Sequence, residues 1–356
     1  MLYRKLGKTN ENISILGLGN EIPINESENI FKYAIDNGVN FIETSNNSQI
    51  GEFLKENDYR DEILIQAKLD SKNFKNDLNE KLRKLNTDYI DIYQIRLTGP
   101  DFNELKELNL LDFLDNILSN GTVKHLGFEA YMEMDYLVEI LDDYPKFEIV
   151  TSQMSYIDEH YKAGTQGLEH LKNLNLGSIV KNPLRNNCLI ENIPIEIKEL
   201  FDYSDIKRTP LEWALQYIWN RDDVHCLINN IKSLENLKEH IEVASRSYVN
   251  SFSENDCEII RAVAIEYWQH KGNMCDICNH CLPCPQGVNI PYCFREYNVA
   301  KMLNNPQASA KYYFELLEDG TRADSCTMCE ECEHLCPQMI NIAEELQKVN
   351  ECFEGD

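Results

Sequence analysis

Long hydrophobic runs and basic residues are both scarce in this sequence of 356 residues. No stretch of about eighteen apolar residues occurs, so we expect no helix that spans a membrane. Lys and Arg number 34 against 60 Asp and Glu, which gives a formal net charge of −26 at pH 7. Such a negative surface repels phosphate groups, so neither nucleic acid nor a membrane is an expected partner.

Two sequence signals are also missing. The N-terminus has no apolar signal segment, which predicts a cytoplasmic protein whose cysteines stay reduced. No G-x-G-x-x-G follows the first expected strand, which weakens the case for an open dinucleotide-binding sheet.

Cysteine, in contrast, is concentrated near the C-terminus. Eight of the 13 cysteines form two sets of four, namely Cys275, Cys278, Cys281 and Cys284, then Cys326, Cys329, Cys332 and Cys336. Within each set two residues separate the first three cysteines, and proline follows the fourth. The second set matches C-x2-C-x2-C-x3-C-P, a run that binds iron–sulfur clusters, and the first set is one residue shorter before its last cysteine. The sequence therefore predicts two [4Fe-4S] clusters.

The ligands of each cluster follow from a precedent. In two-cluster ferredoxins the fourth cysteine of each run binds the other cluster. We therefore expect two ligand groups: Cys275, Cys278 and Cys281 with Cys336, and Cys326, Cys329 and Cys332 with Cys284. Structural zinc and disulfides are the competing interpretations. Zinc sites usually take paired C-x2-C knuckles or histidines, and disulfides do not suit a reducing cytosol, so both are less favoured.

Before the cysteines, short β-rich runs alternate with amphipathic segments. The runs cover residues 13–18, 40–45, 62–67, 89–95, 123–128, 149–153, 177–182 and 224–229. Helical spacing occurs between them, for example in residues 74–85, 108–118, 168–174, 211–219 and 234–244. Alternating strands and helices predict an α/β fold with a parallel sheet, and eight units predict closure into a (β/α)8 TIM barrel. A doubly wound open sheet is the alternative.

The expected domain boundary lies near residue 250. Residues 1–250 would form the barrel, and residues 251–356 a small α-helical, ferredoxin-like domain with helices over 297–303, 311–317 and 342–349. Bonds to metal can hold such a domain together in place of a large core.

Several segments are typical of one known family. They are YRKLGKT, DYIDIYQIR, IDEHYKAGTQGLEHL, KNPLR, TPLEWALQYIWNRDDV and both cysteine runs. In these the chain resembles the aldo/keto reductases, and within them the branch that carries a C-terminal two-cluster ferredoxin-like domain. The resemblance implies a (β/α)8 barrel that binds NADPH across its C-terminal mouth and reduces carbonyls by hydride transfer.

The resemblance also implies a proton-donating tetrad of Asp, Tyr, Lys and His, from which this chain departs. Glu43 stands at the aspartate position, Lys68 keeps the lysine, and Arg96 replaces the histidine. The tyrosine is missing, since residues 45–49 read SNNSQ. Arginine stays protonated well above neutral pH, so Arg96 can bind an anion but cannot easily donate a proton. We expect Glu43, Lys68 and Arg96 to be the catalytic residues, with Lys68 and Arg96 forming a cationic pocket.

The nucleotide-binding loops depart from the family as well. Where the iron–sulfur branch usually has Gly-Gly and Ser-Gly pairs, this chain has Asn186-Asn187 and Asn229-Asn230. Glycine lets the backbone approach a pyrophosphate, and asparagine tolerates left-handed geometry better than most residues. Binding of NADPH is therefore expected to be weakened rather than excluded, with these four asparagines as candidate contacts. A plain NADPH carbonyl reductase has no need of a one-electron relay, so the two clusters suggest single-electron chemistry or a bound mediator such as a flavin.

Simpler roles remain open for several residues. Glu43 and Lys68 could be a remnant ion pair, and Arg96 could fill a redundant site. His125, at a strand start, is expected to be structural, and His160, in a loop, to be solvated. The cysteines outside the runs are expected to be buried or incidental thiols: Cys188, Cys226, Cys257, Cys293 and Cys352.

These features predict a cytoplasmic iron–sulfur oxidoreductase. It would pass electrons from a low-potential carrier such as ferredoxin, through two clusters, to a small anionic substrate at the barrel mouth. Two alternatives remain: an NAD(P)H-dependent carbonyl reductase with a remodelled acid, and a non-catalytic electron-transfer or scaffold protein. The missing Tyr, His and Gly residues favour the second alternative over the first.

Overall fold

The computed structural model describes residues 1–44, 49–69, 72–97 and 101–354. The chain divides into two compact units, Met1–Arg185 with Arg208–Ser253, and Asn186–Lys207 with Glu254–Asp356. We call them the barrel unit and the C-terminal unit. The segment Asn186–Lys207 belongs to the C-terminal unit, whereas the sequence analysis placed it in the barrel domain.

Eight parallel strands close into a barrel, as the sequence predicts. In order around the barrel they are β3 (Leu16–Leu18), β4 (Phe41–Thr44), β5 (Leu64–Leu69), β6 (Ile90–Leu97), β7 (Val123–Ala130), β8 (Ile149–Gln153), β9 (Gly177–Lys181) and β10 (Cys226–Asn229), and β10 pairs with β3. Apolar side chains such as Phe41, Ile92 and Ile179 fill the interior. Parallel strands covered by helices read as nearly continuous apolar runs, which is why the sequence revealed them.

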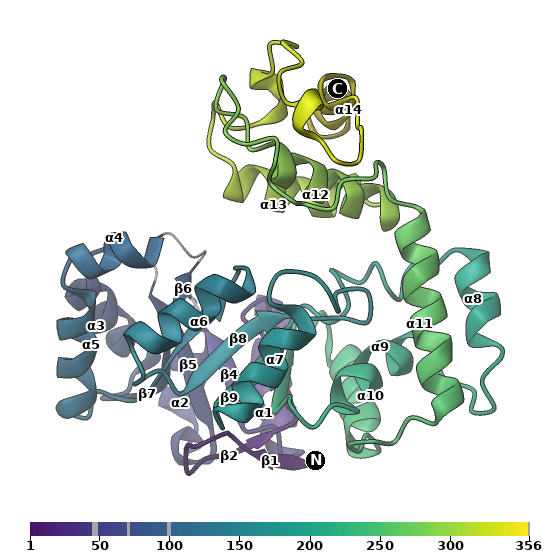
Figure 1. Cartoon of the computed structure of the whole chain (residues 1–356). Coiled ribbons are helices and arrows are strands. Elements are labelled where there is room, and N and C mark those ends of the chain that lie inside the picture. The colour runs from purple at the N-terminus through teal and green to yellow at the C-terminus, as the bar shows by residue number, and fades with distance from the viewer. Residues whose placement is uncertain (45–48, 70–71, 98–100, 355–356) are drawn as a thin grey trace. The chain divides into compact units, whose positions relative to one another are not determined.

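Helices follow the strands and surround the barrel (Figure 1). They are α1 (Ser27–Asp36), α2 (Gln49–Glu56), α3 (Phe74–Leu85), α4 (Asp101–Glu107), α5 (Leu110–Ser119), α6 (Met134–Asp143), α7 (Gly164–Asn173), α9 (Pro210–Trp219) and α10 (Leu234–Ser245). The expected helix over 74–85 has the observed bounds. At the start of α9, Thr209 and Glu212 form a capping box, in which each side chain accepts a hydrogen bond from the other residue's backbone N–H.

A short hairpin closes the N-terminal end of the barrel. Strands β1 (Tyr3–Lys5) and β2 (Asn12–Ser14) pair antiparallel, and Leu6 and Ile13 join the apolar cluster of the barrel interior. The turn passes so close to β9 that a Cβ on Gly7, whose φ is +52°, would lie 2.3 Å from the Gly177 nitrogen. The expected first strand over 13–18 is therefore two elements, because its first residues belong to this hairpin.

The C-terminal unit is helical. It contains α8 (Ile195–Phe201), α11 (Glu254–Gln269), α12 (Ile290–Met302), α13 (Pro306–Leu316) and α14 (Ile342–Phe353), with the cysteine turns between α11 and α12 and between α13 and α14. Helix α8 lies beside α11 (Figure 1), where the Ser204 hydroxyl donates a 2.8 Å hydrogen bond to Asp256. None of the helices in the described part of the chain is long and apolar enough to cross a membrane.

Candidate functional site

Four charged side chains come together inside the barrel, each near the C-terminal end of its strand. Glu43 lies on β4, Lys68 on β5, Glu129 on β7 and Lys181 on β9. The Lys68 Nζ lies 3.2 Å from Glu43 Oε1 and 2.8 Å from Glu129 Oε1. The Lys181 Nζ lies 2.7 Å from each of the same two oxygens. Each ammonium therefore bridges both carboxylates, and we call these residues the Glu–Lys quartet.

The two carboxylates of the quartet are buried and its two lysines are half-buried, and two carboxylates with two ammonium groups give no net charge. The side chains of Glu43 and Glu129 are 1 % and 2 % exposed. Burial raises the pKa of Glu129, but the charges of Lys181 and Lys68 outweigh it and lower this pKa to about 2. Burial likewise lowers the pKa of Lys181, but the carboxylates of Glu43 and Glu129 hold it well above its ordinary value. Glu129 and Lys181 are therefore both ionised at neutral pH, and neither is suited to exchange a proton there.

Arg96 lies near the end of β6 and belongs to a different group of side chains. The side chain of Gln94, two residues earlier, donates to Thr151 on β8, so the alternation of the strand points Arg96 to the barrel interior as well. Its guanidinium lies 5.0 Å from the ring centre of Tyr131, and the Lys162 ammonium lies 4.4 Å from the same ring. Two cations thus lie near one aromatic ring at the C-terminal mouth of the barrel.

A second tyrosine extends this group. Lys162 lies 5.2 Å from the ring centre of Tyr161, and Arg185 lies 5.0 Å from it. Arg185 is buried and makes a two-pronged ion pair with Asp158, with a distance of 3.1 Å from its Nε to Asp158 Oδ2. We call Arg96, Tyr131, Tyr161, Lys162 and Arg185 the cationic arc. Asp158 pairs with Arg185, and Arg96 and Lys162 bring two further cationic side chains to the group.

The three expected catalytic residues lie in two different groups, with Glu43 and Lys68 in the quartet and Arg96 in the cationic arc. Glu43 and Lys68 form the expected ion pair, but Lys68 is also paired with Glu129, so its charge is balanced inside the quartet. The sequence analysis missed Glu129 and Lys181. The available signal was a charged residue at the end of an apolar strand, in VKHLGFEA and GSIVK, because that end of a barrel strand carries functional groups. Residues 45–48, which hold most of the segment without tyrosine, lie outside the described residues.

The two histidines lie where the sequence placed them. His125, near the start of β7, has its Nδ1 2.7 Å from Glu148 and its Nε2 3.6 Å from Glu11. These contacts join the hairpin to the barrel wall, which fits the structural role expected for His125. His160 is exposed in the loop after β8.

The four candidate nucleotide contacts are engaged within the chain. The Asn229 side chain lies 2.8 Å from His240 Nε2, and Asn230 donates to Glu21 at 2.8 Å. Asn186 and Asn187, in the C-terminal unit, have the left-handed φ values of 54° and 71° that asparagine tolerates. Asn187 also donates to Glu191 at 2.7 Å.

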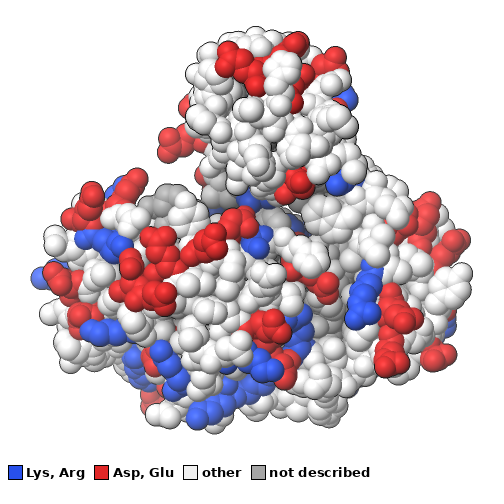
Figure 2. Space-filling model, viewed as in Figure 1, with Lys and Arg blue, Asp and Glu red and all other residues white. Residues whose placement is uncertain are grey.

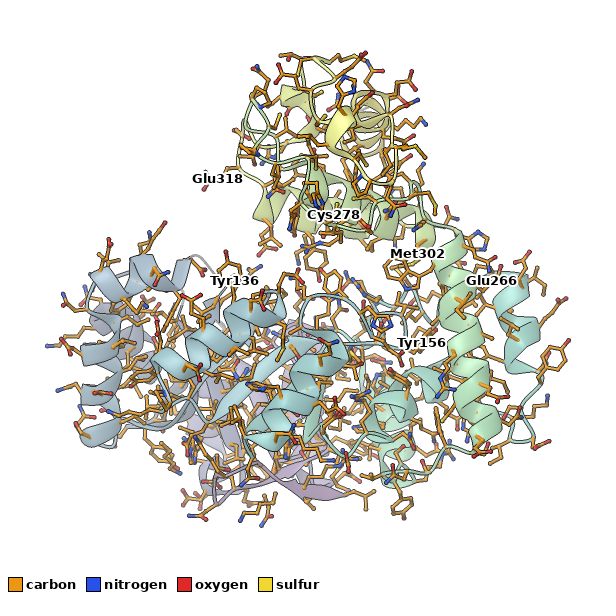
Figure 3. The ribbon with its side chains drawn as sticks, viewed as in Figure 1. Tyr136, Tyr156, Glu266, Cys278, Met302 and Glu318 are labelled. Atoms are coloured by element: carbon orange, nitrogen blue, oxygen red, sulfur yellow. The ribbon has the colours of Figure 1, made fainter. Side chains whose placement is uncertain are left out.

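Four thiols of the C-terminal unit surround one small pocket. Its lining includes Cys275, Cys278, Cys281 and Cys336, together with the apolar Ile290, Phe294, Ile340 and Ile342. Figure 3 marks Cys278 in this unit. Burial, together with the nearby thiols of Cys275, Cys278 and Cys336, raises the pKa of the Cys281 thiol to about 11. The fourth cysteine of the second run therefore lies with the first three of the first run.

The other run has the reciprocal neighbours. Burial, together with the nearby thiols of Cys281, Cys284 and Cys326, raises the pKa of Cys332 to about 12. Cys284 of the first run is thus near the second run. Among the described residues, no three His, Cys, Asp or Glu side chains converge as they would around a single metal ion.

The two cysteine runs also share an unusual backbone. In the first, Ile277 and Asn279 have φ values of 61° and 63°, and in the second Met328 and Glu330 have 56° and 60°. These are the same positions relative to the first two cysteines of each run. A β-branched residue with a left-handed backbone, such as Ile277, is rare and strained. Such strain persists only where the surrounding structure holds it, and it is found most often at functional sites.

The strained backbone turns N–H groups toward sulfur. Ile277 N–H donates to Cys275 Sγ and Met328 N–H to Cys326 Sγ, both at 3.4 Å. Such bonds satisfy thiolates that bind an iron–sulfur cluster and tune its potential. Apolar side chains line the first set of thiols, and Cys284, Cys326 and Cys332 pack against the apolar core of the unit. With their matching turns, the two sets therefore fit a pair of cubane clusters.

Comparison with known proteins agrees with the fold. Residues 13–264, more than half of the chain, match the Aldo/keto reductase family. Two similar solved structures are the holo and apo forms of aldo-keto reductase AKR11C1 from Bacillus halodurans, with TM-scores of 0.63 and 0.62 and identities of 19 % and 20 %; each match covers 74 % of this chain and 96 % of that one. The protein PA4992 from Pseudomonas aeruginosa has a TM-score of 0.55 and 17 % identity, over 69 % of this chain and 94 % of that one. On the family match and the closed eight-stranded barrel, this chain belongs to the aldo/keto reductase family of oxidoreductases.

Proposed function

We propose that this protein is an iron–sulfur oxidoreductase in which two [4Fe-4S] clusters in the C-terminal unit pass electrons to a small anionic substrate at the barrel mouth. The observation that carries the proposal is the reciprocal placement of the thiols, with Cys336 beside the first run and Cys284 beside the second. Cys275, Cys278, Cys281 and Cys336 would hold one cluster, and Cys284, Cys326, Cys329 and Cys332 the other. When bound, the clusters would supply one-electron transfer.

Both thiol groups have a side that faces solvent. Cys278 and Cys329 are exposed, whereas the other six ligands are buried or half-buried. The apolar Met328 and Met339, near cysteines of the second run, are 41 % and 86 % exposed. An external carrier of electrons, such as a ferredoxin, could approach a cluster closely at these points. Acidic side chains are spread over the surface in Figure 2, so the charge of that carrier will affect how fast it docks.

The barrel unit would bind and orient the substrate. Arg96 and Lys162 supply two positive charges at the mouth, which suits a carboxylate or phosphate. The quartet lies nearby at the strand ends, where its paired charges form a rigid polar floor. Glu129 and Lys181 hold their protons too weakly and too tightly, respectively, to act as the acid that ordinary carbonyl reduction needs.

The alternatives differ in what must bind. A carbonyl reductase with a remodelled acid needs NAD(P)H, and a scaffold or electron-transfer protein needs no substrate at the mouth. The cationic arc favours a substrate over an empty scaffold, because cationic side chains at the C-terminal mouth of a barrel suit the binding of a carboxylate or phosphate. A bound flavin can accept single electrons, so we also propose it as a mediator between the clusters and the substrate.

Metal analysis is the direct test. Protein purified without oxygen should contain about eight irons and eight acid-labile sulfides per chain, as two cubes require. Its electron paramagnetic resonance spectrum after reduction should show two interacting clusters. Stoichiometric zinc with little sulfide would overturn the proposal.

A further inference from the structure

The start of α10 is the place where a barrel of this type would hold a phosphate group. The loop that follows the last strand, β10, leads directly into this helix. The first turn of a helix presents unpaired N–H groups and a positive dipole end, and loops after the last strands of a barrel commonly use them to bind phosphate. The family resemblance also implies that a nucleotide lies near Asn229 and Asn230.

In this chain the donors at that position are already occupied. Leu234 N–H, the first of the helix, donates to the Glu26 carboxylate at 3.1 Å. Asn236 N–H donates to the hydroxyl of the capping Ser233 at 3.1 Å, and Lys232 N–H, in the loop, donates to the Asn236 side chain at 3.3 Å. Three N–H groups that could bind a phosphate therefore bind side-chain oxygens of the same chain.

Glu26 reaches the helix from a distant part of the sequence. It ends a short 3-10 helix, η1 (Ile24–Glu26), in the loop between β3 and α1. The same loop is attached at a second point, where Glu21 accepts a 2.8 Å hydrogen bond from Asn230. The backbones also meet, since Gly19 N–H donates to the Asn229 carbonyl at 2.9 Å and a Cβ on Gly19 would lie 2.2 Å from Asn230 Oδ1. The loops after the first and last barrel strands are thus joined by side-chain and backbone contacts.

The space beside this junction is negatively charged. The lining of a pocket there includes the carboxylates of Glu21 and Glu52 and one ammonium, that of Lys232. Glu26 is a third carboxylate near this junction, through its contact with Leu234. A pyrophosphate brought into this space would be repelled, and it would have to displace Glu26 to reach the helix.

We infer that Glu26 is a built-in substitute for a nucleotide phosphate, and that the barrel does not hold NAD(P)H in the extended position that the family resemblance implies. A carboxylate at the N-terminal end of a helix has the same kind of favourable interaction with the helix dipole as a phosphate. Because it is tethered, its effective concentration is far above that of any free nucleotide. The inference concerns only the barrel unit, so it stands or falls independently of the iron–sulfur proposal.

Titration of NADPH tests this inference. Wild-type protein, with its metal content measured first, should show no saturable binding by calorimetry up to about 1 mM NADPH. Glu26→Ala should uncover the helix end and tighten binding of both NADPH and inorganic pyrophosphate at least tenfold. Glu28→Ala is the matched control, because Glu28 carries the same charge two residues away and is exposed on α1. It should leave both affinities unchanged.

The outcomes separate cleanly. Saturable wild-type binding of NADPH at concentrations up to about 1 mM would overturn the inference, and so would a Glu26→Ala variant that binds no better than Glu28→Ala. Should Glu26→Ala not fold, as judged by its circular dichroism and melting curve, Glu26→Gln carries the test. That variant keeps an oxygen that accepts from Leu234 but loses the charge, and it should bind pyrophosphate more tightly than wild type. If Glu26→Gln binds pyrophosphate no more tightly than wild type, the negative charge of Glu26 does not exclude the phosphate and the inference fails.

Discussion

Ile277 and Met328 occupy equivalent positions in the two cysteine runs. Each has a left-handed backbone, and each donates its N–H to the sulfur of the cysteine two residues earlier at 3.4 Å. The runs are 51 residues apart, counting from Cys275 to Cys326, and their lengths differ by one residue. Their matched geometry therefore reflects a common requirement on the thiols, which a cluster in each run would explain.

Changing Cys336 to Ser should disturb the cluster of the first run. The reason is that Cys336 lines the pocket of Cys275, Cys278 and Cys281. In electron paramagnetic resonance spectra of the reduced protein, Cys336→Ser should therefore alter the same cluster signal that Cys278→Ser alters. It should leave unchanged the signal that Cys329→Ser alters. Cys257→Ser, in α11, is the control and should leave both signals intact. If Cys336→Ser alters only the signal that Cys329→Ser alters, the proposed ligand exchange is wrong.

Changing Glu129 to Gln should destabilise the barrel strongly. It leaves the ammonium groups of Lys68 and Lys181 with Glu43 as their one remaining carboxylate in the quartet. Breaking a buried pair from one side costs about 3–5 kcal/mol, which denaturant unfolding can measure. Lys172→Ala breaks a pair of similar length, 2.8 Å to Asp222, between side chains that are about half exposed, and should change the free energy of unfolding little. If both variants lose the same free energy of unfolding, the quartet stabilises the fold no more than an exposed ion pair does.

Changing Arg96 to Ala should weaken binding of small anions at the barrel mouth. Loss of one charge-assisted hydrogen bond should reduce the binding free energy of inorganic phosphate or pyruvate by about 1.5–3 kcal/mol, measured by calorimetry. Lys162→Ala should have an effect in the same direction, because both cations lie on the Tyr131 ring. Arg83→Ala removes an exposed charge from α3 and serves as the control. A lower melting temperature with unchanged anion binding would show that Arg96 is only structural.

His125 should make the stability of the barrel depend on pH. Burial lowers its pKa, but the hydrogen bond to Glu148 and the charges of Glu148 and Glu11 outweigh burial and raise the pKa above its ordinary value. A raised pKa in the folded state means that protonation stabilises the fold. The stabilisation is complete below about pH 6.5, the unfolded value, and is lost as pH rises through the folded pKa.

The measurement is the difference in unfolding free energy between wild type and His125→Gln from pH 6 to pH 9. The difference should shrink as the pH rises. His225, whose pKa burial lowers to about 4, is present in both proteins and cancels in the difference. A difference that stays constant or grows with pH would contradict the assigned role of His125.

Much of the barrel could be predicted from the sequence because its strands are buried on both faces. Residues 149–153 were expected as a strand and observed as one, and the helix over 74–85 was correct at both ends. Helix α12 was expected to begin at residue 297 but begins at Ile290. It is buried nearly all round, with even Arg295, Glu296 and Asn298 covered, so its sequence has no amphipathic period to reveal it.

The site could be predicted only in part. The cysteine spacing predicted two sets of thiols, because three of the four ligands proposed for each cluster lie within one run, and the exchange of the fourth followed from the precedent of two-cluster ferredoxins. The partners of Lys68 could not be read in the same way. Glu129 and Lys181 lie 61 and 113 residues further along the chain, and only closure of the barrel brings them to the same point. The role of Glu26 could not be predicted for the same reason, because its contact residue Leu234 lies near the other end of the barrel sequence.

Two members of the quartet also limit where protons can come from. Glu129 gives up its proton near pH 2 and Lys181 keeps its own far above neutrality, so neither changes its protonation between these limits. A reduction at the mouth that consumes protons would then have to draw them from groups other than Glu129 and Lys181. The charges of these two residues would be the same before and after each turnover.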